Sequence, residues 1–423
     1  RRAAQPTTDE GRRPMSSEIS VSLADVQAAL KAIREHVLLS PCKHSPKLSK
    51  RAGCDLYVKM ENQQRTGAFK DRGAMYAVVS LDDKARKAGV IAASAGNHAQ
   101  GLAFAAQLNG IHATIVMPET APLAKINGTA EYGAEVVLHG AGYDDAFGRA
   151  VELQKEKGYT FVHAFDDPHV IAGQGTIGLE LLEQQPDLDV VVVPIGGGGL
   201  AAGMLVAMKA LNPKIRFVGV QAANIASTKA SVAAGKITTV RGSSIADGIS
   251  VATPGRHTYP IIAKYIDEIV TVDEDEVADG ILALLENENT VTEGSGAVSV
   301  AAVLHGKIAG IAGKKVCCVL SGGNIDTTFL GKVLNKGLAK EGRLSKFIVT
   351  VPDRPASIVD LATIAAANQA SILDIHQKRT FNLADVRETE IELTLETRGP
   401  QQIEALVKAI AAKGYEVRSF EFD

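Results

Sequence analysis

Strand and helix patterns alternate through most of this chain, and that alternation limits the folds it can adopt. Between residues 55 and 320, short apolar runs are separated by longer stretches whose apolar residues recur at helical spacing. Such alternation is typical of β-α-β units, in which a helix connects two parallel strands. The run Val190–Val193 is apolar at every position, as a strand covered on both faces requires. The sequence therefore predicts an α/β fold with mostly parallel, twisted sheets.

The pattern also gives bounds for the individual elements. The predicted strands are Asp55–Glu61, Val90–Ala93, Ala113–Met117, Glu135–Leu138, Thr160–Ala164, Val190–Pro194, Arg216–Gln221, Glu268–Val272 and Lys315–Leu320. The predicted helices include Asn97–Leu108, Asp144–Lys157, Ala201–Leu211 and Glu274–Leu285. Another helix is predicted to start near Lys70, and the first helix to begin after the N-cap Ser22 and to be stopped by Pro41.

After about Leu344 the order of elements changes to β-α-β-β-α-β. These predicted elements are Phe347–Val351, Ala356–Asn368, Ile372–Lys378, Glu388–Glu396, Gln401–Lys413 and Glu416–Phe420. This order is that of the ferredoxin-like fold. A polar linker at Lys340–Ser345 precedes it, so we predict a main region over residues 18–344, with a smaller subdomain at roughly 68–160, and a separate domain over 345–423.

Composition excludes several classes of protein. The chain has 45 Lys and Arg against 48 Asp and Glu, so no basic excess suggests a nucleic-acid partner. Its longest apolar runs are of strand length, and we expect no membrane span. Four cysteines, of which Cys317 and Cys318 are adjacent, do not form a secreted disulfide framework. Residues 1–17 lack the apolar stretch of a signal peptide and are expected to be a disordered or artificial extension of a cytoplasmic protein.

The most informative local feature is a run of glycines between an apolar strand and a helix. Gly196, Gly197, Gly198 and Gly199 are followed by Leu200, and no Lys-Ser/Thr pair follows as in a Walker loop. Without side chains, the backbone N–H groups can converge on an anion at the positive end of the helix. A flexible turn is the alternative, but the flanking strand and helix favour a phosphate-binding loop.

A second strand-to-helix turn reads Ser94-Ala95-Gly96-Asn97-His98-Ala99-Gln100-Gly101. It offers a hydroxyl, an amide and free backbone N–H groups at a helix N-terminus, which suits a carboxylate. An ordinary helix cap would explain Ser94 but not the whole cluster.

Two further segments complete a candidate site. Lys70 follows Phe69 among small residues, and burial there would lower the pKa of its amine and make it available for a Schiff base. Ser321 follows an apolar strand and precedes Gly322-Gly323-Asn324. A phosphate loop, a carboxylate loop, a reactive lysine and a hydroxyl together match what pyridoxal phosphate and an amino-acid substrate need.

With these motifs the chain resembles the threonine/serine dehydratases (threonine ammonia-lyases) of the tryptophan-synthase-β fold type. The likeness covers about residues 22–341 and depends on Gly67-Ala68-Phe69-Lys70-Asp71-Arg72-Gly73-Ala74 and on the loop that begins at Ser94. The resemblance implies that Lys70 forms the imine with pyridoxal 5'-phosphate and that Phe69 packs against its ring. It further implies that Asn97 bonds the cofactor's phenolic oxygen and that Ser321 meets the pyridine nitrogen.

The same resemblance assigns the two loops. The segment Ser94, Ala95, Gly96, Asn97 and His98 would hold the substrate carboxylate, and Gly196 to Leu200 the cofactor phosphate. Lys70 and Ser321 are then the expected catalytic residues. The expected reaction converts L-threonine to 2-oxobutanoate and ammonia, with L-serine to pyruvate as a side activity.

Individual positions help to separate the reactions of this family. His98 stands where cysteine and threonine synthases have threonine, although Lys70-Asp71-Arg72 is common in those synthases. Serine racemases carry a serine at the position of Ala95, and divalent-metal ligands where this chain has Gln221 and Ser227. We therefore expect no such metal site, while a monovalent ion held by carbonyls remains open. A serine dehydratase or racemase-type enzyme is the nearest alternative, and a catalytically inactive amino-acid sensor a more distant one.

The tail resembles an ACT domain. That resemblance implies an amino-acid effector such as isoleucine or valine, bound near Val351-Pro352-Asp353-Arg354-Pro355-Ala356, and allosteric control of an enzyme of isoleucine biosynthesis. Ala356 departs from the glycine often found there, so a purely assembling role for the tail, in a homodimer or homotetramer, stays open. A catabolic role is equally open at this point.

Overall fold

The computed structural model describes residues 19–379 and 385–419. The chain divides into two compact units, residues 1–325 and 326–423. Helix α14 (Thr327–Lys340) thus belongs with the second unit, whereas the sequence analysis placed residues up to 344 with the first. The expected N-terminal extension and the last residue of the final predicted strand, Phe420, lie outside the described residues.

The first unit contains a six-stranded sheet in the order β1-β2-β10-β7-β8-β9. Its strands are, in chain order, Cys42–His44, Asp55–Lys59, Val190–Pro194, Arg216–Ala222, Glu268–Val272 and Lys315–Val319. Strands β1 and β2 pair antiparallel, and all other neighbours pair parallel. This confirms the predicted α/β class with mostly parallel sheets.

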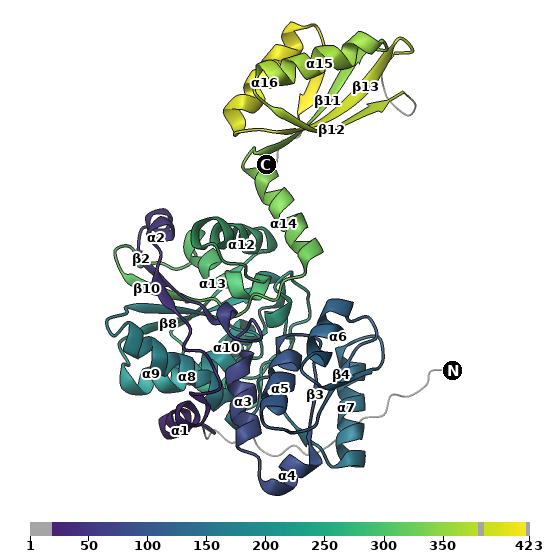
Figure 1. The fold of residues 1–423 in the computed structure, drawn as a ribbon. Helices are drawn as coiled ribbons and strands as arrows, with labels where there is room; N and C mark the ends of the chain where they lie inside the picture. Colours follow the sequence, from purple (N-terminus) through teal and green to yellow (C-terminus); the bar gives the residue numbers. More distant parts are fainter. Residues whose placement is uncertain (1–18, 380–384, 420–423) are drawn as a thin grey trace. The chain divides into compact units, whose positions relative to one another are not determined.

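Helices cover both faces of this sheet, as Figure 1 shows. On one face, Val191 and Phe217 pack with residues of α8 (Pro168–Gln184) and α9 (Gly199–Leu211). On the other face lies α13 (Gly294–Leu304), against which α12 (Glu274–Glu288) packs. Burial on both faces explains why these strands are apolar at nearly every position.

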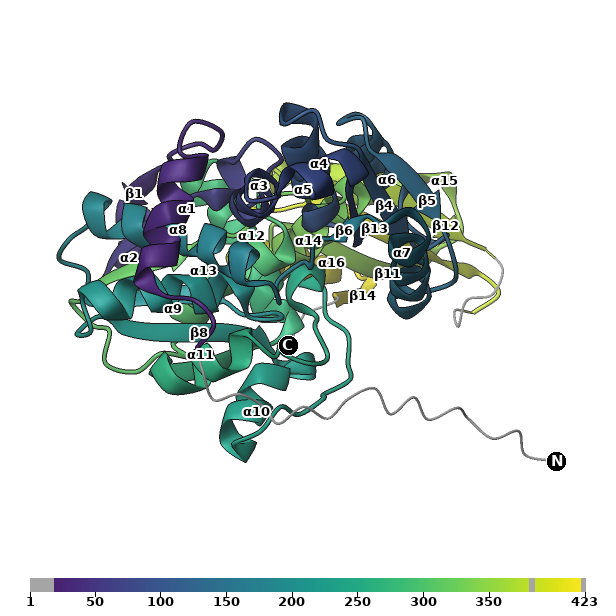
Figure 2. The same cartoon turned by 90° about the horizontal axis from the view of Figure 1, so that it is seen from below.

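A smaller four-stranded sheet has the order β5-β4-β3-β6 and is parallel throughout. Its strands are Val90–Ala93 (β3), Ala113–Met117 (β4), Glu135–Leu138 (β5) and Thr160–Phe161 (β6). Alternate residues of β3 enter different cores: Val90 packs with residues of helix α5 (Asn97–Leu108), and Ile91 with residues of α7 (Tyr143–Lys157). Helix α3 (Lys70–Val79) lies between the two sheets in both Figure 1 and Figure 2.

The other helices of the first unit are α1 (Leu23–Ile33), α2 (Pro46–Ala52), α4 (Asp83–Ala88), α6 (Leu123–Ala130), α10 (Ser227–Ala234), α11 (Thr258–Tyr265) and the 3-10 turns η1 (Glu61–Gln63), η2 (Ala223–Ile225) and η3 (Asp247–Ile249). Among the described residues, no helix is long and apolar enough to cross a bilayer.

The second unit contains an antiparallel sheet in the order β12-β13-β11-β14. Its elements after α14 are β11 (Leu344–Pro352), α15 (Pro355–Ala367), β12 (Ser371–Lys378), β13 (Glu388–Glu396), α16 (Pro400–Ala412) and β14 (Glu416–Ser419). Inward-facing Phe347, Leu393 and Leu406 contribute to its core. The predicted β-α-β-β-α-β order is confirmed.

Differences from the predicted elements have local causes. The strand predicted over Thr160–Ala164 ends at Phe161, because the following backbone turns into a cavity where Ala164 offers its carbonyl to Lys70. The first helix does begin after Ser22 with a capping box, but it ends at Ile33 and not near Pro41. Strand β1 and helix α2 are not predicted, because each is too short to show a period.

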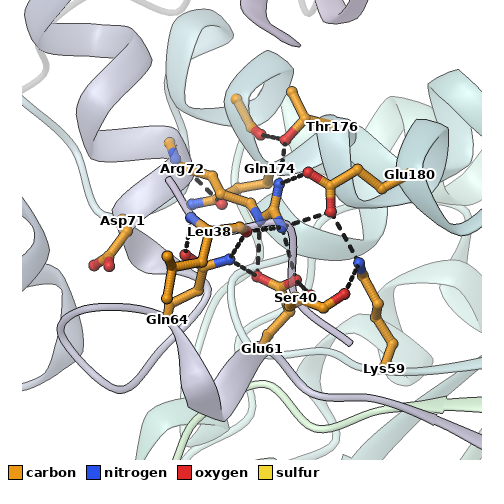
Figure 3. A network of polar contacts seen from close by, with 12 residues as sticks. Leu38, Ser40, Lys59, Glu61, Gln64, Asp71, Arg72, Gln174, Thr176 and Glu180 are labelled. Atoms are coloured by element: carbon orange, nitrogen blue, oxygen red, sulfur yellow. Dashed lines mark hydrogen bonds and ion pairs between the residues drawn. The ribbon is translucent and has the colours of Figure 1, made fainter. Parts of the chain in front are cut away.

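A buried network of charges holds α3 against the large sheet (Figure 3). Arg72 Nε lies 2.8 Å from Glu61 Oε2, and its Nη1 lies 2.7 Å from Glu180 Oε1. Lys59 Nζ donates to Glu180 Oε2 at 2.8 Å and to the Ser40 carbonyl at 2.8 Å. Two cations and two carboxylates therefore balance in a buried region. Burial alone would raise the pKa of Glu61, but the charge and hydrogen bonds of Arg72 outweigh it and hold that pKa below its usual range.

Replacing Arg72 by methionine leaves Glu61 and Glu180 without their main partner. Removing one member of a buried ion pair costs roughly 3–5 kcal/mol, so we expect R72M to lower the free energy of unfolding at pH 7 by about that amount. Urea unfolding followed by circular dichroism measures it. The control is R149M, since Arg149 pairs with exposed Glu152 and Glu156, where about 0–1 kcal/mol is expected.

The two variants also differ in pH dependence. Because the folded-state pKa of Glu61 is lowered, its contribution is present at neutral pH and is lost as pH falls through that lowered value. The deficit of R72M should therefore shrink in acid. Equal stability losses for R72M and R149M at pH 7 would contradict this account of the network.

Candidate active site

A cavity of about 750 Å³ lies in the first unit, where strands of both sheets end. Its walls include the turns that follow β3, β6, β7 and β10, which is the edge where parallel α/β sheets bind ligands. All residues proposed from the sequence line it: Phe69, Lys70, Ser94, Ala95, Gly96, Asn97, His98, Gly196, Gly197, Gly198, Gly199, Leu200 and Ser321.

The glycine loop takes a shape that other residues could not adopt. Gly198 has φ +99° and caps helix α9, whose first amides have no partner within the helix. A Cβ on Gly197 would lie 2.4 Å from the ring of Phe165, and one on Gly196 2.9 Å from Ile249 Cα. The loop is fixed from behind, because Thr258 Oγ1 donates to the Gly197 carbonyl at 2.6 Å. Its amide groups and helix dipole form a rigid place for a dianion.

Lys70 begins helix α3 and faces the cavity. Its Nζ donates to the Ala164 carbonyl at 2.7 Å and lies 5.0 Å from the centre of the Phe69 ring. Burial lowers the pKa of its amine to about 8, although the nearby Glu293 acts in the opposite direction. A sizeable neutral fraction therefore exists near neutral pH, and it grows as pH rises toward that value. A neutral amine is the form that attacks a carbonyl.

The turn after β3 presents the N-terminus of α5 to the cavity. Ser94 Oγ accepts from the Gly96 N–H at 3.2 Å, which shapes the turn, and Asn97 is the first residue of the helix. The imidazole of His98 is directed elsewhere, since its Nε2 contacts the Val162 carbonyl at 2.9 Å and must be the protonated nitrogen. Burial lowers the pKa of His98 to about 3, so the ring is neutral. A carboxylate at this turn would meet the backbone N–H of His98 and not its side chain.

Ser321 stands at the end of β10 and is buried. Its Oγ lies 3.2 Å from the Ser295 carbonyl, to which it donates. Ser321 lines the cavity together with the glycine loop, because that loop follows β7 and β7 is the parallel neighbour of β10 in the large sheet.

Glu293 is a further residue of the site, at the start of α13. It caps α13 and lines the cavity, and its Oε1 accepts from Asn97 Nδ2 at 2.7 Å. Burial first and the charge of Asp247 second raise the pKa of Glu293 to about 7, against the lowering effects of Asn97, Lys125 and Lys70. It is therefore partly protonated at neutral pH.

Sequence reasoning missed other lining residues. Lys125 on α6 and Asp247 on η3 meet across the cavity with a Nζ–Oδ2 distance of 3.1 Å. Tyr143 and Asp144 line it from the start of α7. Lys125, Tyr143 and Asp144 stand in helices that follow strands of the small sheet, which is the only sequence signal that could have indicated them, whereas Asp247 lies beyond α10 and has no such signal.

The two positions compared with racemase metal ligands are engaged in other bonds. Gln221 Nε2 donates to the Ile195 carbonyl at 3.2 Å, and Ser227 Oγ donates to the Val251 carbonyl at 2.7 Å. Over residues 19–379 and 385–419, no group of three or more His, Cys, Asp or Glu side chains could hold a metal ion. His163 lines the cavity, and its Nδ1 accepts from the Asp166 N–H at 3.0 Å.

Comparison with known proteins decides the family. The model of the family described as "Pyridoxal-phosphate dependent enzyme" matches residues 33–322. The chain belongs to this family. An L-threonine ammonia-lyase of Thermotoga maritima is 47% identical over 399 residues, which cover 94% of this chain and 99% of that protein.

Two further relatives place the chain within the family. The enzyme of Escherichia coli K12 named L-threonine dehydratase catabolic TdcB is 43% identical over 318 residues, covering 75% of this chain and 97% of that protein. The crystal structure of serine racemase from Dictyostelium discoideum has a TM-score of 0.69 and 36% identity, covering 73% of this chain and 99% of that chain. These matches confirm the family indicated by the motifs, the threonine/serine dehydratases, and its cofactor, pyridoxal phosphate.

The residues present fit that cofactor. The tight loop Gly196–Gly199 suits its phosphate, because a Cβ at Gly197 or Gly199 would lie 3.0 Å or less from Phe165. Lys70 offers an amine with a lowered pKa beside the Phe69 ring. Ser321 supplies a hydroxyl on the cavity wall, and Asn97 an amide with one Nδ2 hydrogen left after its bond to Glu293.

The glycine loop gives a direct test of the phosphate site. We expect G197A to raise the dissociation constant for pyridoxal 5'-phosphate at least about tenfold, because the new methyl group would meet Phe165 and displace the loop amides from the phosphate. Titrating the apoprotein with cofactor and following visible absorbance measures this. The control is G148A, whose Cβ meets nothing within 4 Å in helix α7. An unchanged cofactor affinity in G197A would contradict the assignment of this loop to the cofactor phosphate.

Proposed function

We propose that this protein is an L-threonine ammonia-lyase that converts L-threonine to 2-oxobutanoate and ammonia, with L-serine as a poorer substrate. The observation that carries the proposal is 47% identity to an enzyme of that name over almost the whole of both chains. The cavity supports the proposal, since Lys70, the glycine loop and the turn before α5 all line it. When bound, pyridoxal phosphate withdraws electrons from the substrate Cα.

The chain's own residues orient the substrate. Its carboxylate binds the backbone N–H groups at the start of α5, where the positive end of the helix dipole attracts it. Ala95 in this turn has no group that can exchange a proton.

Lys70 moves the proton. Its Nζ, with a pKa lowered to about 8, is a base that accepts the proton from the substrate Cα. The Ala164 carbonyl, which accepts from Nζ at 2.7 Å, holds the amine at this place. Loss of the β-hydroxyl gives an enamine, which takes up water after release and yields the 2-oxo acid and ammonia.

Ser321 is assigned to the cofactor's ring nitrogen. A hydroxyl is neutral at every working pH and cannot hold a proton on that nitrogen as a carboxylate would. The ring is then the weaker electron sink, which favours early departure of the β-hydroxyl over reprotonation of Cα.

A racemase-type activity is the second candidate, because serine racemase of Dictyostelium discoideum shares the fold at 36% identity. Racemisation needs a second proton carrier on the face of Cα opposite Lys70. Ala95 stands where the family resemblance puts that carrier. The proposal is therefore elimination as the main reaction.

Turnover of L-threonine by the purified enzyme and by K70A tests the proposal. We expect 2-oxobutanoate and ammonia in equal amounts from the wild type, and a loss of at least about 10³-fold in kcat for K70A, because its base is absent. After borohydride treatment, mass spectrometry should find the cofactor attached to the peptide with Lys70. The control is K264A, since Lys264 also lies 5.0 Å from an aromatic ring, that of Tyr265, but outside the cavity. Near-normal deamination by K70A, or D-serine as the main product from L-serine, would contradict the assignment.

The C-terminal unit is proposed to regulate or assemble a cytoplasmic homodimer or homotetramer. The relative named L-threonine dehydratase catabolic TdcB aligns over 97% of its own length but over only 75% of this chain. Near the expected effector loop, Asp353 Oδ1 accepts from Gln377 Nε2 at 3.2 Å and from Arg379 Nε at 3.3 Å. Binding of isoleucine or valine at this loop would be consistent with a role of the enzyme in isoleucine biosynthesis.

Assembly through the tail has its own support. Strand β12 is one of the two edge strands of the sheet and exposes Ile372 at 37%, Leu373 at 58% and Ile375 at 38%. An apolar edge strand is suited to pairing with another chain.

Threonine saturation curves with and without isoleucine or valine test regulation. If an effector binds the tail, we expect the concentration for half-saturation to change by about 5- to 150-fold, the usual size of allosteric coupling. The same curves for L373E, together with its mass by light scattering, test assembly. The control is L211E, because Leu211 is 51% exposed at the end of α9. If neither amino acid changes the saturation curve, the proposed regulation is contradicted. If L373E has the same mass as the wild type, the proposed assembly through β12 is contradicted.

A further inference from the structure

A chain of side-chain hydrogen bonds runs from a backbone carbonyl before Lys70 to the carboxyl group of Glu293. Asn324 Nδ2 donates to the Thr66 carbonyl at 2.7 Å and to Asn97 Oδ1 at 2.9 Å. Asn97 Nδ2 in turn donates to Glu293 Oε1 at 2.7 Å. Asn324 itself is absent from the cavity lining, whereas Asn97 and Glu293 belong to it.

The chemistry of the first acceptor sets the direction of the whole chain. A backbone carbonyl can only accept, so the Asn324 atom beside Thr66 must be the amide nitrogen. That nitrogen donates its second hydrogen to Asn97, which must therefore present its oxygen. The amide nitrogen of Asn97 is then turned toward Glu293, and its other hydrogen remains for the cavity. Reversing Asn324 would set its oxygen against the Thr66 carbonyl and Asn97 Oδ1, and reversing Asn97 alone would set its amide nitrogen against that of Asn324.

The Thr66 carbonyl is itself held in place. Asp71 Oδ2 accepts from the Thr66 N–H at 3.1 Å, and Asp71 Oδ1 accepts from its hydroxyl. Burial raises the pKa of Asp71 to about 6 in spite of these bonds, and it is mostly ionised at neutral pH. The residue that follows Lys70 thus serves this chain of bonds and not the cavity.

The segments around Asn324 and Lys70 are also joined through their backbones. The Phe69 N–H donates to the Ser321 carbonyl at 3.0 Å, and the Gly323 N–H donates to the Gly67 carbonyl at 2.9 Å. Gly67 has φ +79°, and a Cβ there would lie 2.4 Å from Asn324 Oδ1. Asn324 is consequently confined by Gly67 on one side and bonded on the other, with little freedom to turn.

We propose that Asn324 is a positioning residue that fixes the orientation of the Asn97 amide, so that an N–H of Asn97 and not its carbonyl faces the cofactor's place. This inference rests on the proposed function of the site, because the group that Asn97 would meet is the phenolic oxygen of pyridoxal phosphate. An N–H directed at that oxygen stabilises negative charge on it, whereas a carbonyl would oppose it.

Glu293 is the second group that depends on this orientation. With the Asn97 N–H turned toward it, either form of the carboxyl group can accept. If the Asn97 amide were reversed, its oxygen would face Glu293, and only the protonated carboxyl group could donate a hydrogen bond to that oxygen. The charged groups that act on Glu293 are Asp247, Lys125 and Lys70, and none of them contacts Asn324 in the bonds described here.

The variants N324D and N324S test the proposal, with N62D as the matched control. The carboxylate of N324D cannot donate to Asn97, so Asn97 should turn and present its carbonyl to the cofactor's place. In N324S a hydroxyl has one hydrogen for two acceptors, which keeps the test available should N324D fold poorly. Asn62 is equally half-buried and donates from Nδ2 to Thr290 Oγ1 at 2.8 Å and to the Val291 carbonyl at 3.0 Å, but it does not line the cavity.

Two measurements separate positioning from a purely structural role. The pH midpoint of the bound cofactor's visible absorbance should move to higher pH in N324D, because charge on the phenolic oxygen is no longer stabilised. Its kcat for L-threonine should fall about tenfold or more, the size of one charge-assisted hydrogen bond, while KM changes less. N324S should shift both quantities in the same direction by less, and N62D should shift neither.

The outcomes distinguish this inference from the proposed function. If both Asn324 variants match N62D in absorbance midpoint and kcat, the positioning role is overturned, whatever their thermal stability. If the wild type binds cofactor but does not deaminate threonine, the proposed function fails, and the absorbance midpoints still decide the role of Asn324.

Discussion

The buried guanidinium of Arg72 holds the helix on which the site depends. Arg72 lies two residues after Lys70, and its bonds to Glu61 and Glu180 attach the first turn of α3 to η1, which follows β2, and to α8, which packs on the large sheet. The backbone that carries the reactive amine is therefore anchored to the layer from which the glycine loop after β7 also starts. Precision of this kind is what orientation in catalysis requires.

The first turn of α3 carries a partly buried amine, that of Lys70, and a fully buried guanidinium, that of Arg72, and their pKa values shift in opposite directions. Arg72 has two carboxylate partners, and their attraction outweighs the cost of desolvation, so its pKa is raised. Lys70 has a carbonyl partner and only the distant influence of Glu293, so desolvation prevails and its pKa falls to about 8. Arg72, whose charge is paired with two carboxylates, stays ionised and has a structural role, whereas Lys70, which lacks a close carboxylate partner, can act as a base. The difference lies in which neighbours the fold supplies and not in depth alone.

Local patterns were enough to predict most of the fold. Strands such as Val90–Ala93 and Val190–Pro194 have the predicted bounds, because apolar runs between turn residues leave little choice. The glycine loop and the α5 turn were recognisable because a ligand that binds backbone N–H groups needs a specific local sequence. The roles given to their individual residues remain predictions.

Features made by distant segments had no such signal. The contacts of Glu293 with Asn97 and of Lys125 with Asp247 join residues 196 and 122 positions apart. The helical expectation past Ile33 and the strand expectation past Phe161 were wrong for a related reason, since apolar residues there are buried in irregular backbone. Val37 is buried without being helical, and Val162 is buried beside the strand end.

The acid-base character of the cavity depends on Lys70 and Glu293, two residues far apart in the sequence that line the same cavity. Desolvation lowers the pKa of Lys70 to about 8 and raises that of Glu293 to about 7, and each group moderates the shift of the other. The pKa values of an amine and a carboxyl group ordinarily lie far apart, but here both lie near neutrality. In that range the protein can hold or release a proton at either group at small cost, which no single buried residue would permit. Because Asn97 is bonded to Glu293, the hydrogen-bond chain from Asn324 also reaches this pair.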